Sequence, residues 1–342
     1  MATKSYGIDF GTYAVKIYKI HQGVRFHQKS VIATRDKGNV IAIGEEAYSM
    51  IGKEPEYIHI DRPIQNGVIA NFDTMLSLMN CISMDMGRDG DKLKGATFLV
   101  AVPTEVTDVE KKTFYDIIDS SIIRPKKIRI TEKPLADAIG CGIDIANSNG
   151  SLVVDIGADT TEISVISQGG IVLSRLCPYG GYRFDEAIIA AVRRKYNLLI
   201  GHRTAENIKI SLVDFSSDGT DVMFAYGRDF VSGLPREREI NSELVNRAVA
   251  EPLQAILDAV KSVLERIPPE ISADVYQGGI MLTGGSACMK GIADFISAEL
   301  GLRVNIPEDP ATTVARGLGR VMEEEKYEHL AKPLRQTYYE ND

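Results

Sequence analysis

The sequence contains no tryptophan and only four cysteines among its 342 residues. The cysteines Cys81, Cys141, Cys177 and Cys288 are far apart and form no Cys-x-x-Cys pair. This spacing favours reduced thiols over a disulfide framework or a zinc site. No apolar run approaches the roughly 18 residues of a membrane span, and the first six residues are too few and too polar for a signal peptide. These absences predict a cytoplasmic protein.

The chain also lacks a basic excess, because its formal net charge is −8. A nucleic-acid-binding protein would show a basic stripe, so we expect no nucleic-acid partner. The content of 44 % hydrophobic and 25 % charged residues is typical of a soluble globular protein, and 342 residues suffice for two domains with full cores. Strand-like and helix-like segments alternate along the chain, which predicts an α/β fold.

What the sequence does contain is two turns rich in glycine and threonine, at residues 6–12 and 153–161. Each follows an apolar strand, carries an aspartate at the bend and leads into a second apolar strand. Glycines let the backbone approach a phosphate, amides and hydroxyls of such a turn donate to phosphate oxygens, and aspartate can hold a hydrated Mg²⁺. The pair of turns therefore predicts a duplicated fold that holds one nucleotide from both sides.

Several local patterns predict secondary structure between these turns. Residues 25–33 are expected to form one strand, and residues 222–231 a pair of strands. Residues 85–91 are expected to form a charged loop, and residues 241–267 a long helix that Pro268 and Pro269 close. The polar residues 147–150 are expected to form a hinge between the two halves.

The chain resembles the actin-like ATPase superfamily and, within it, the bacterial rod-shape filament proteins of the MreB/Mbl family. The resemblance runs from residue 6 to about residue 322. Its motifs are, in order, GIDFGT at 7–12, GEEAYSMIGKEP at 44–55, RPIQNGVIANFD at 62–73, VDIGADTTEISVISQGGIV at 154–172, DEAIIAAVRRKYNLLIG at 185–201 and LTGGSACMKGI at 282–292. The resemblance implies the actin-like fold, with two duplicated domains, each a five-stranded mixed sheet flanked by helices, and a nucleotide cleft between them.

The same resemblance implies domain boundaries and partners. Residues 1–150 would form the first domain, with a small insertion at 31–79, completed by residues 311–342. Residues 151–310 would form the second domain, with an insertion at 186–249. The protein would assemble with itself into protofilaments, single or paired, and organise cell shape and wall elongation at the inner face of the cell membrane. The wall-elongation machinery and membrane-anchored adaptors would be its partners, and ATP hydrolysis would be coupled to filament turnover.

Carried over position by position, the resemblance implies a site for ATP or ADP with Mg²⁺. The metal, mostly through water, would face Asp9 and Asp155. The phosphates would contact Gly11, Thr12, Tyr13 and Lys16 of the first turn and Gly157, Ala158, Thr160 and Thr161 of the second. The ribose and adenine would contact Glu206 and Lys209, one helical turn apart, and the adenosine would approach Gly284, Gly285 and Ser286. Catalysis would be in-line attack of water on the γ-phosphate, with Lys133, Asp159, Thr160 and Thr161 as the catalytic positions.

Each of these residue types also has a purely structural interpretation. The two aspartates are common as turn residues, and Lys16 is common as a solvated strand lysine. Glu206 and Lys209 have the spacing of a surface ion pair, and Gly284 and Gly285 suit a turn between strand and helix. The occurrence of two matching turns in one chain favours the nucleotide site over these interpretations.

The catalytic machinery departs from the family pattern in three ways. Lys133 replaces the glutamate that orients the attacking water, Ala158 and Asp159 replace the last two glycines of the second turn, and Tyr182 replaces an acid. We expect the non-glycine residues to strain this turn, and a carboxylate beside a polyphosphate costs Coulomb energy unless it is neutralised. Either Lys133 and Asp159 compensate each other or the hydrolytic site has decayed. ATP hydrolysis is therefore expected to be slow.

Direct membrane binding is not favoured by the sequence. Only six residues precede Gly7, too few for an amphipathic helix, and residues 85–94 offer little to insert beyond Met86 and Leu93. The tail at residues 331–342 is expected to be a flexible end that docks a partner.

Three alternatives to a polymerising protein stay open. The first is a non-polymerising or weakly hydrolysing assembly adaptor. The second is a small-molecule kinase, for which Asp159 is the one candidate base. The third is a chaperone-like ATPase, for whose separate peptide-binding domain the chain has no room.

Overall fold

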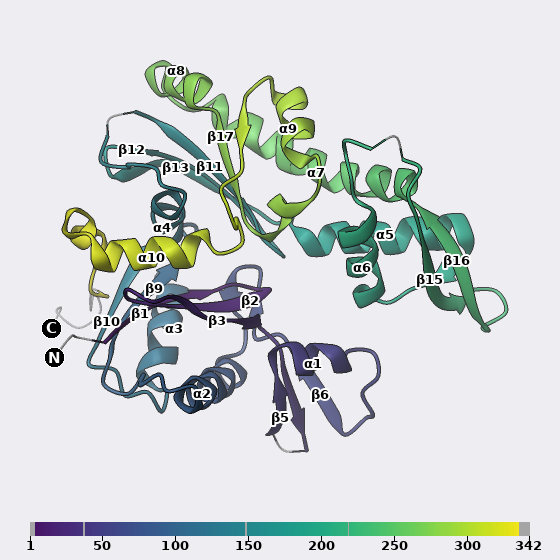
Figure 1. The fold of residues 1–342 in the computed structure, drawn as a ribbon, viewed down its shortest axis with the longest axis horizontal. Coiled ribbons are helices and arrows are strands. Elements are labelled where there is room, and N and C mark those ends of the chain that lie inside the picture. The colour runs from purple at the N-terminus through teal and green to yellow at the C-terminus, as the bar shows by residue number, and fades with distance from the viewer. Residues whose placement is uncertain (1–3, 37, 148, 218, 335–342) are drawn as a thin grey trace, which may run out of the picture. The chain divides into compact units, whose positions relative to one another are not determined.

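The computed structural model describes residues 4–36, 38–147, 149–217 and 219–334. The chain divides into two compact units, of which unit 1 comprises Met1–Ile145 and Thr312–Asp342 and unit 2 comprises Ala146–Ala311. Each unit contains a five-stranded mixed sheet with helices packed on it (Figure 1). The expected fold class is confirmed.

The two five-stranded sheets repeat one topology. In each, three consecutive strands form an antiparallel meander, a later strand pairs in parallel with the first of them, and a fifth strand pairs in parallel with that one. The unit 1 sheet has the order β10-β9-β1-β2-β3, with β1 (Ser5–Phe10), β2 (Ala14–Lys19), β3 (Gly23–Lys29), β9 (Thr97–Val102) and β10 (Lys127–Glu132). The unit 2 sheet has the order β13-β12-β11-β17-β18, with β11 (Ser151–Ile156), β12 (Thr161–Ser167), β13 (Gly170–Cys177), β17 (Ile280–Thr283) and β18 (Val304–Asn305).

Helices cover both faces of the unit 1 sheet (Figure 1). They are α2 (Phe72–Arg88) and α3 (Asp108–Asp119) on one face, and α4 (Lys133–Gly140) and α10 (Thr313–Glu323) on the other. Helix α3 starts with a reciprocal capping box formed by Thr107 and Glu110. Helices α4 and α10 lie in close backbone contact at Gly140 and Gly317, where a Cβ atom would overlap the backbone of the facing helix.

Each unit also carries a small sheet. Unit 1 has the order β5-β4-β6, with β4 (Ile32–Arg35), β5 (Asn39–Ile43), β6 (Ile58–Asp61) and the helix α1 (Gly44–Met50), and a hairpin of β7 (Ile64–Gln65) and β8 (Val68–Ile69). Unit 2 has the order β14-β15-β16, with β14 (Leu198–Leu199), β15 (Val222–Asp229) and β16 (Pro235–Asn241), next to α5 (Gly181–Tyr196) and α6 (His202–Leu212).

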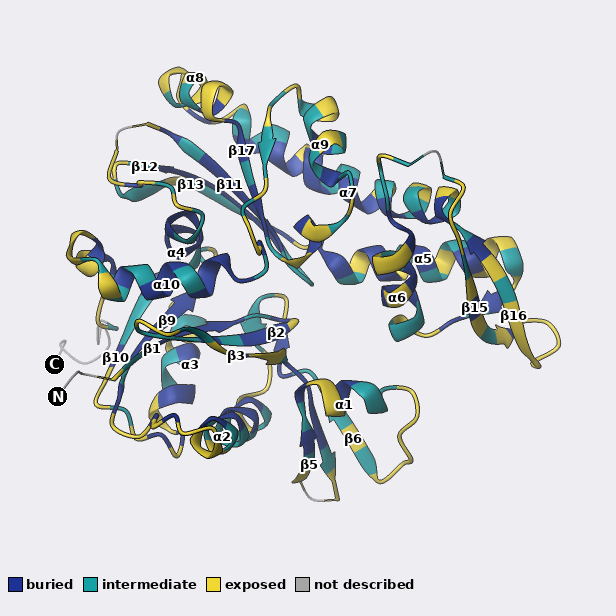
Figure 2. Ribbon diagram, viewed as in Figure 1, coloured by how far each residue is buried: buried dark blue, intermediate teal, exposed yellow. Residues whose placement is uncertain are grey.

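The remaining helices belong mostly to unit 2. They are α7 (Ser242–Leu264), α8 (Pro269–Gly278), α9 (Ile292–Leu300) and the short 3₁₀ segment η1 (Gly285–Cys288), while η2 (Glu325–Leu330) follows α10 in unit 1. Buried residues concentrate in the central strands and on the helix faces turned toward them (Figure 2). Among the described helices, none is both long and apolar enough to cross a membrane.

Two strand predictions are wrong in detail. Residues 25–33 do not form one strand, because the chain leaves the main sheet at Ser30 and starts β4 in the small sheet. The backbone N–H of Ser30 donates to the carbonyl of Tyr13 (2.8 Å), which continues the register of β2 and β3 by one pair before the chain turns into β4. The predicted strand pair at residues 222–231 is a single strand, β15, and its partner β16 begins only at Pro235.

Two other predictions also need correction. Residues 85–88 are the last turn of α2 rather than a loop, and the helix predicted at 241–267 ends at Leu264. Pro269 was expected to close the preceding helix, but it is the first residue of the next helix, α8. Its missing N–H breaks no helical hydrogen bond there, because the first N–H groups of a helix have no partner within the helix.

The structure describes only the first part of the predicted tail, and it places the apolar residues of the 85–94 segment in the core. Residues 335–342 lie outside the described residues, but Lys332 is held by two backbone hydrogen bonds to Ile130 (2.8 and 2.9 Å). Met86 and Leu93, the apolar residues of the 85–94 segment, are buried in the unit 1 core. Asp91 of the same segment is buried too, and Lys19 and Arg25 pair with it.

Candidate functional site

The first turn joins β1 to β2 in unit 1. The turn requires a glycine at position 11, because a Cβ atom there would come within 2.7 Å of the carbonyl oxygen of Ala14. The hydroxyl of Ser30 donates to the carbonyl of Gly11 (2.6 Å) and fixes the turn from the end of β3. Thr12 is nearly buried, whereas Tyr13 is exposed at the rim. The turn is therefore held in place by the chain beside it.

Asp9 and Lys16 face each other across the same hairpin. They are directly opposite in the antiparallel register of β1 and β2, and Lys16 Nζ lies 2.9 Å from a carboxylate oxygen of Asp9. Both side chains are largely buried. The hairpin thus places one carboxylate and one ammonium side by side at the turn, which is the pair of charges that a metal and a phosphate require.

The second turn joins β11 to β12 in unit 2. Its backbone closes through a hydrogen bond from the N–H of Gly157 to the carbonyl of Thr160 (2.9 Å). The start of α5 supports it, because Gly181 donates to the carbonyl of Gly157 (2.9 Å) and Tyr182 to that of Ala158 (2.8 Å). The start of α5 therefore fixes the backbone of the turn at Gly157 and Ala158.

The expected strain in this turn is not found. Neither Ala158 nor Asp159 has a positive φ, so an ordinary residue fits each position without a left-handed backbone. A glycine is required instead at position 180, because a Cβ atom there would come within 2.7 Å of the carbonyl oxygens of Gly157 and Ala158.

The two threonines of the second turn lie in different environments. Thr161 is fully buried, and its hydroxyl donates to the carbonyl of Tyr179 (2.8 Å), so it ties the turn to the end of β13. Thr160 and Asp159 are only partly buried. Lys133, the other catalytic candidate, is the first residue of α4 in unit 1.

Lys209 is brought to the second turn by α6. Its Nζ lies 2.8 Å from the carboxylate of Asp185 on α5 and donates to the carbonyl of Gly181 (3.0 Å). The sequence analysis did not identify Asp185 as a site residue. Its contact with Lys209 joins two helices, and no local sequence pattern predicts such a contact. Burial raises the pKa of Asp185 to about 6, although Lys209 acts in the opposite direction. Glu206 is buried on the same helix as Lys209.

Residues 284–286, which follow β17, also lie beside the second turn. Gly284 has a φ of +84°, and a Cβ there would collide with the carboxylate of Asp155. The hydroxyl of Ser286 donates to the carbonyl of Gly157 (3.3 Å), and Gly285 borders open space. Unit 2 therefore gathers the predicted residues around one turn; they are Asp155, Gly157, Ala158, Lys209, Gly284 and Ser286.

The residues suit Mg²⁺ bound together with a phosphate. Among the described residues, no group of three or more histidine, cysteine or acidic side chains has the arrangement of an all-protein metal site. Mg²⁺ is usually held by one or two carboxylates with waters and phosphate oxygens, and each turn offers one such carboxylate, Asp9 in unit 1 and Asp155 in unit 2. The metal would neutralise phosphate charge; the chain's own residues would position it.

Comparison with known proteins identifies the family of the chain. A family model described as MreB/Mbl protein matches residues 3–330. The chain is similar to the cell shape-determining protein Mbl of Bacillus subtilis (strain 168), with 38 % identity over 325 residues that cover 94 % of this chain and 97 % of the relative. It is similar to the cell shape-determining protein MreB of Escherichia coli (strain K12), with 37 % identity over 329 residues and 94 % of each chain covered.

A solved structure gives the same answer. MreB 5 of Spiroplasma citri bound to AMPPNP matches with a TM-score of 0.90 and 31 % identity, covering 96 % of this chain and 98 % of that one. The resemblance predicted from the motifs is confirmed.

Proposed function

Because the chain belongs to the MreB/Mbl family, we propose that it is an ATP-binding protein that assembles with itself and takes part in determining cell shape. The observation that carries the proposal is the repeated turn. Each unit ends the first strand of its main sheet with a buried aspartate and a glycine in close contact with the backbone. The solved relative from Spiroplasma citri was bound to the ATP analogue AMPPNP, which supports nucleotide binding by this chain.

The proposed roles of the residues follow from their positions. Lys16, Gly11 and Thr12 bind phosphate oxygens, and Asp9 faces the metal beside them. In unit 2, Asp155 faces the metal, and the second turn binds phosphate through its backbone and Thr160. Ala158 contributes backbone only, and the buried hydroxyl of Thr161 fixes the turn. Gly284, Gly285 and Ser286 allow the adenosine to approach, with Glu206 and Lys209 on the adjoining helix.

Hydrolysis in this proposal is slow. Lys133 stands where a glutamate is expected to orient water, and a lysine ammonium cannot accept the proton of that water. Asp159 is the carboxylate that remains for this task, and its position in an unstrained, partly buried turn supports that role. Self-assembly is proposed from family membership, and wall-elongation proteins and membrane-anchored adaptors are its proposed partners.

The test is nucleotide-dependent thermal stabilisation. ATP with Mg²⁺ should raise the melting temperature of the wild-type protein, by mass action on the folded state. Asp155→Asn should lose most of that shift, whereas Asp258→Asn on the surface of α7 should keep it. An unchanged shift in Asp155→Asn would show that the second turn does not bind the metal–nucleotide complex.

Assembly is tested separately by sedimentation and electron microscopy with ATP, with ADP and without nucleotide. Filaments that depend on nucleotide support the polymerising function. A protein that binds ATP but stays monomeric at high concentration and at every salt concentration is the adaptor, the second candidate. Phosphoryl transfer to a small acceptor, detected with labelled ATP, would instead indicate the kinase.

A further inference from the structure

Lys29, the last residue of β3, has an ammonium group that contacts both the first phosphate turn and the helix α1 of the small sheet. Its Nζ lies 3.2 Å from the centre of the Tyr48 ring and 3.4 Å from a carboxylate oxygen of Glu45, and both partners belong to α1. The same Nζ lies 5.1 Å from the centre of the Tyr13 ring, which belongs to the turn. One side chain therefore bridges two parts of unit 1 that are separate in the sequence.

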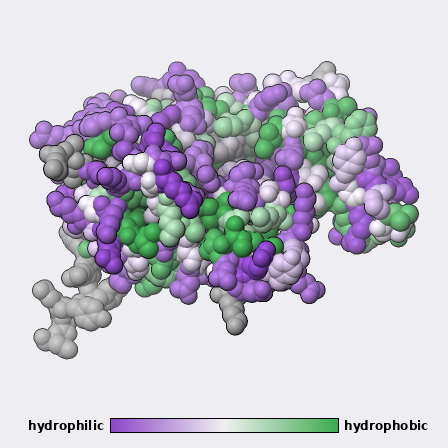
Figure 3. All heavy atoms as spheres, turned by 60° about the horizontal axis from the view of Figure 1, so that its bottom comes forward, coloured by the Kyte–Doolittle hydropathy of each residue, from purple (hydrophilic) through white to green (hydrophobic). Residues whose placement is uncertain are grey.

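The ammonium of Lys29 is largely shielded from water, because its side chain is only 14 % exposed. A lysine ammonium within about 6 Å of an aromatic ring is attracted to it, and more strongly when the pair is desolvated. Tyr48 is 5 % exposed and packs in the core of the small sheet. Figure 3 brings the side of α1 and α2 forward and shows a mainly hydrophilic surface with separate hydrophobic patches. The contact between Lys29 and Tyr48 lies beneath this surface.

Backbone contacts bring the same segments together. Lys29 is opposite Ala14 in the antiparallel register of β2 and β3, directly after the turn. Gly44 is the first residue of α1, and its N–H donates to the carbonyl of Val31 (2.9 Å). A Cβ at Gly44 would collide with the side chain of Gln28, the neighbour of Lys29 in β3. The start of α1 is therefore packed closely against the end of β3.

These contacts affect the turn because Tyr13 follows directly after Thr12. The carbonyl of Tyr13 accepts the backbone N–H of Ser30 (2.8 Å), and Lys29 attracts the Tyr13 ring, so both backbone and side chain are restrained. A binding loop that is ordered before its ligand arrives loses less entropy on binding. If α1 moved away from β3, Lys29 would lose its two partners on that helix and would hold Tyr13 less firmly.

We propose that Lys29 is a positioning residue that couples α1 to the first phosphate turn, so that docking of α1 raises the affinity of the turn for ATP. This inference rests on the nucleotide binding proposed above and adds a residue that lies outside the sequence motifs. Coupling between two sites is reciprocal. ATP in the turn therefore stabilises α1 in its docked position, and a partner that binds α1 and displaces it weakens ATP binding.

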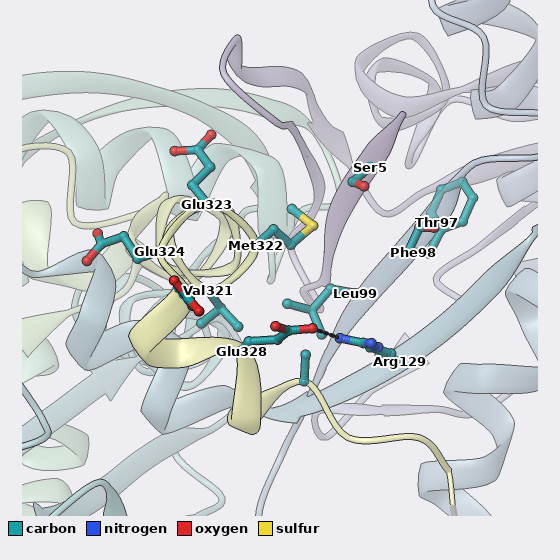
Figure 4. Close-up of a pocket in the computed structure, with 12 residues that line it drawn as sticks. Ser5, Thr97, Phe98, Leu99, Arg129, Val321, Met322, Glu323, Glu324 and Glu328 are labelled. Carbon is teal, nitrogen blue, oxygen red and sulfur yellow. Dashed lines mark hydrogen bonds and ion pairs between the residues drawn. The ribbon is translucent and has the colours of Figure 1, made fainter. Parts of the chain in front are cut away.

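The first test is Lys29→Met, which keeps a long side chain and removes its charge. The dissociation constant of ATP, from fluorescent-nucleotide competition, should rise by about fivefold or more, the lower end of typical couplings between sites. Arg129→Met is the matched control and should bind ATP as wild type does, because Arg129 also pairs with a glutamate, Glu328, at 3.4 Å in unit 1 (Figure 4). Arg129 lines a pocket at the first residues of β1 and β9, at the other end of β1 from the turn. Equal ATP affinity of Lys29→Met and wild type overturns the proposal, and so does an equal loss in both variants.

Loss of charge and loss of positioning have opposite signs at Glu45. Removing a carboxylate should by itself slightly tighten the binding of anionic ATP. Glu45→Gln also removes a partner of Lys29, so it should instead weaken ATP binding, by about twofold because the ion pair is partly exposed. Glu46→Gln is the control, since it removes the same charge from the next position of α1. ATP binding by Glu45→Gln that is as tight as that of Glu46→Gln overturns the proposal.

The ring of Tyr48 is tested by two neutral substitutions. Tyr48→Phe keeps the ring and should keep the ATP affinity, whereas Tyr48→Leu removes the ring and should weaken ATP binding severalfold. In the Lys29→Met background, Tyr48→Leu should have no further effect on ATP affinity, because it acts through Lys29. An undiminished effect in that background would come from core packing and would overturn the proposal.

Hydrogen exchange tests the coupling in the absence of nucleotide. Tyr48→Leu, a change within α1, should speed exchange of the amides of residues 11–14, and Arg129→Met should not. Faster exchange confined to residues 44–50 would show that the turn does not respond to α1 and would overturn the proposal. A wild-type protein without an ATP-dependent melting shift would refute nucleotide binding, and exchange at residues 11–14 would still decide whether Lys29 couples the two segments.

Discussion

Asp185 and Lys209 form a buried ion pair directly behind the second phosphate turn, with 2.8 Å between carboxylate and ammonium. Lys209 also holds the carbonyl of Gly181, and the N–H of Gly181 holds the carbonyl of Gly157. A continuous path of short contacts therefore joins α6 through α5 to the turn. The position of the turn depends on a pair of charges that lie outside the motif itself.

This pair predicts how stability depends on pH. Burial raises the pKa of Asp185 to about 6 from an ordinary 3.8. Between these values the folded state binds more protons than the unfolded state, so the free energy of unfolding falls as pH rises from about 4 to about 6. The size of the effect is at most about 3 kcal/mol, from roughly two pKa units at 1.36 kcal/mol each.

Asp185→Asn should remove this contribution. We expect the difference in unfolding free energy between pH 4.5 and pH 7 to change in the variant by about 1–3 kcal/mol relative to wild type. Urea titrations at the two pH values measure it, and taking the difference cancels the other titrating groups. Glu186→Gln, on the exposed side of the same helix, should leave the wild-type pH dependence intact. Identical pH dependence in Asp185→Asn and wild type would contradict the assignment.

The sequence predicted those features that local chemistry determines. An aspartate after an apolar strand, followed by glycine, identified both turns, and the helix predicted at residues 241–267 matches α7 within three residues at each end. The fold class followed from the order of these motifs. The functional roles of the site residues stay predictions, because no ligand contact has tested them.

The features that the sequence did not predict depend on contacts between distant segments. At the break between β3 and β4, the hydroxyl of Ser30 donates to the carbonyl of Gly11, a contact that no pattern within residues 25–33 contains. Asp185 gains its role only when α5 lies beside α6. The helix α10 was not predicted either, although its sequence is amphipathic.

The contact between α4 and α10 gives a prediction about packing. A Cβ at Gly317 would overlap the carbonyl of Ala136, so Gly317→Ala must push the two helices apart. We expect a loss of about 1–3 kcal/mol of unfolding free energy, as for other overpacked sites. Gly87→Ala is the control, because Gly87 lies in α2 with no neighbour within 4 Å of an added Cβ. It should be neutral or gain up to about 1 kcal/mol from helix propensity. Equal melting temperatures for the two variants would show that α10 adjusts freely.

The last prediction concerns the two substitutions of opposite charge, Lys133 and Asp159. Lys133→Glu alone adds a carboxylate near the phosphates and should weaken ATP binding through like-charge repulsion. Asp159→Gly alone removes the carboxylate available to orient water, so it should tighten ATP binding and slow hydrolysis. The unstrained backbone at residue 159 means that Asp159→Gly tests charge and not relief of strain.

The double variant separates compensation from decay. It restores the family arrangement of a glutamate before Pro134 and a glycine in the turn, so it should hydrolyse ATP fastest of the four proteins. ATP affinity from fluorescent-nucleotide competition and single-turnover hydrolysis rates complete the cycle. Residues that act together couple by roughly 0.5–3 kcal/mol. Strict additivity in both affinity and rate would mean that the two positions changed independently, and the hydrolytic site would then be a decayed one.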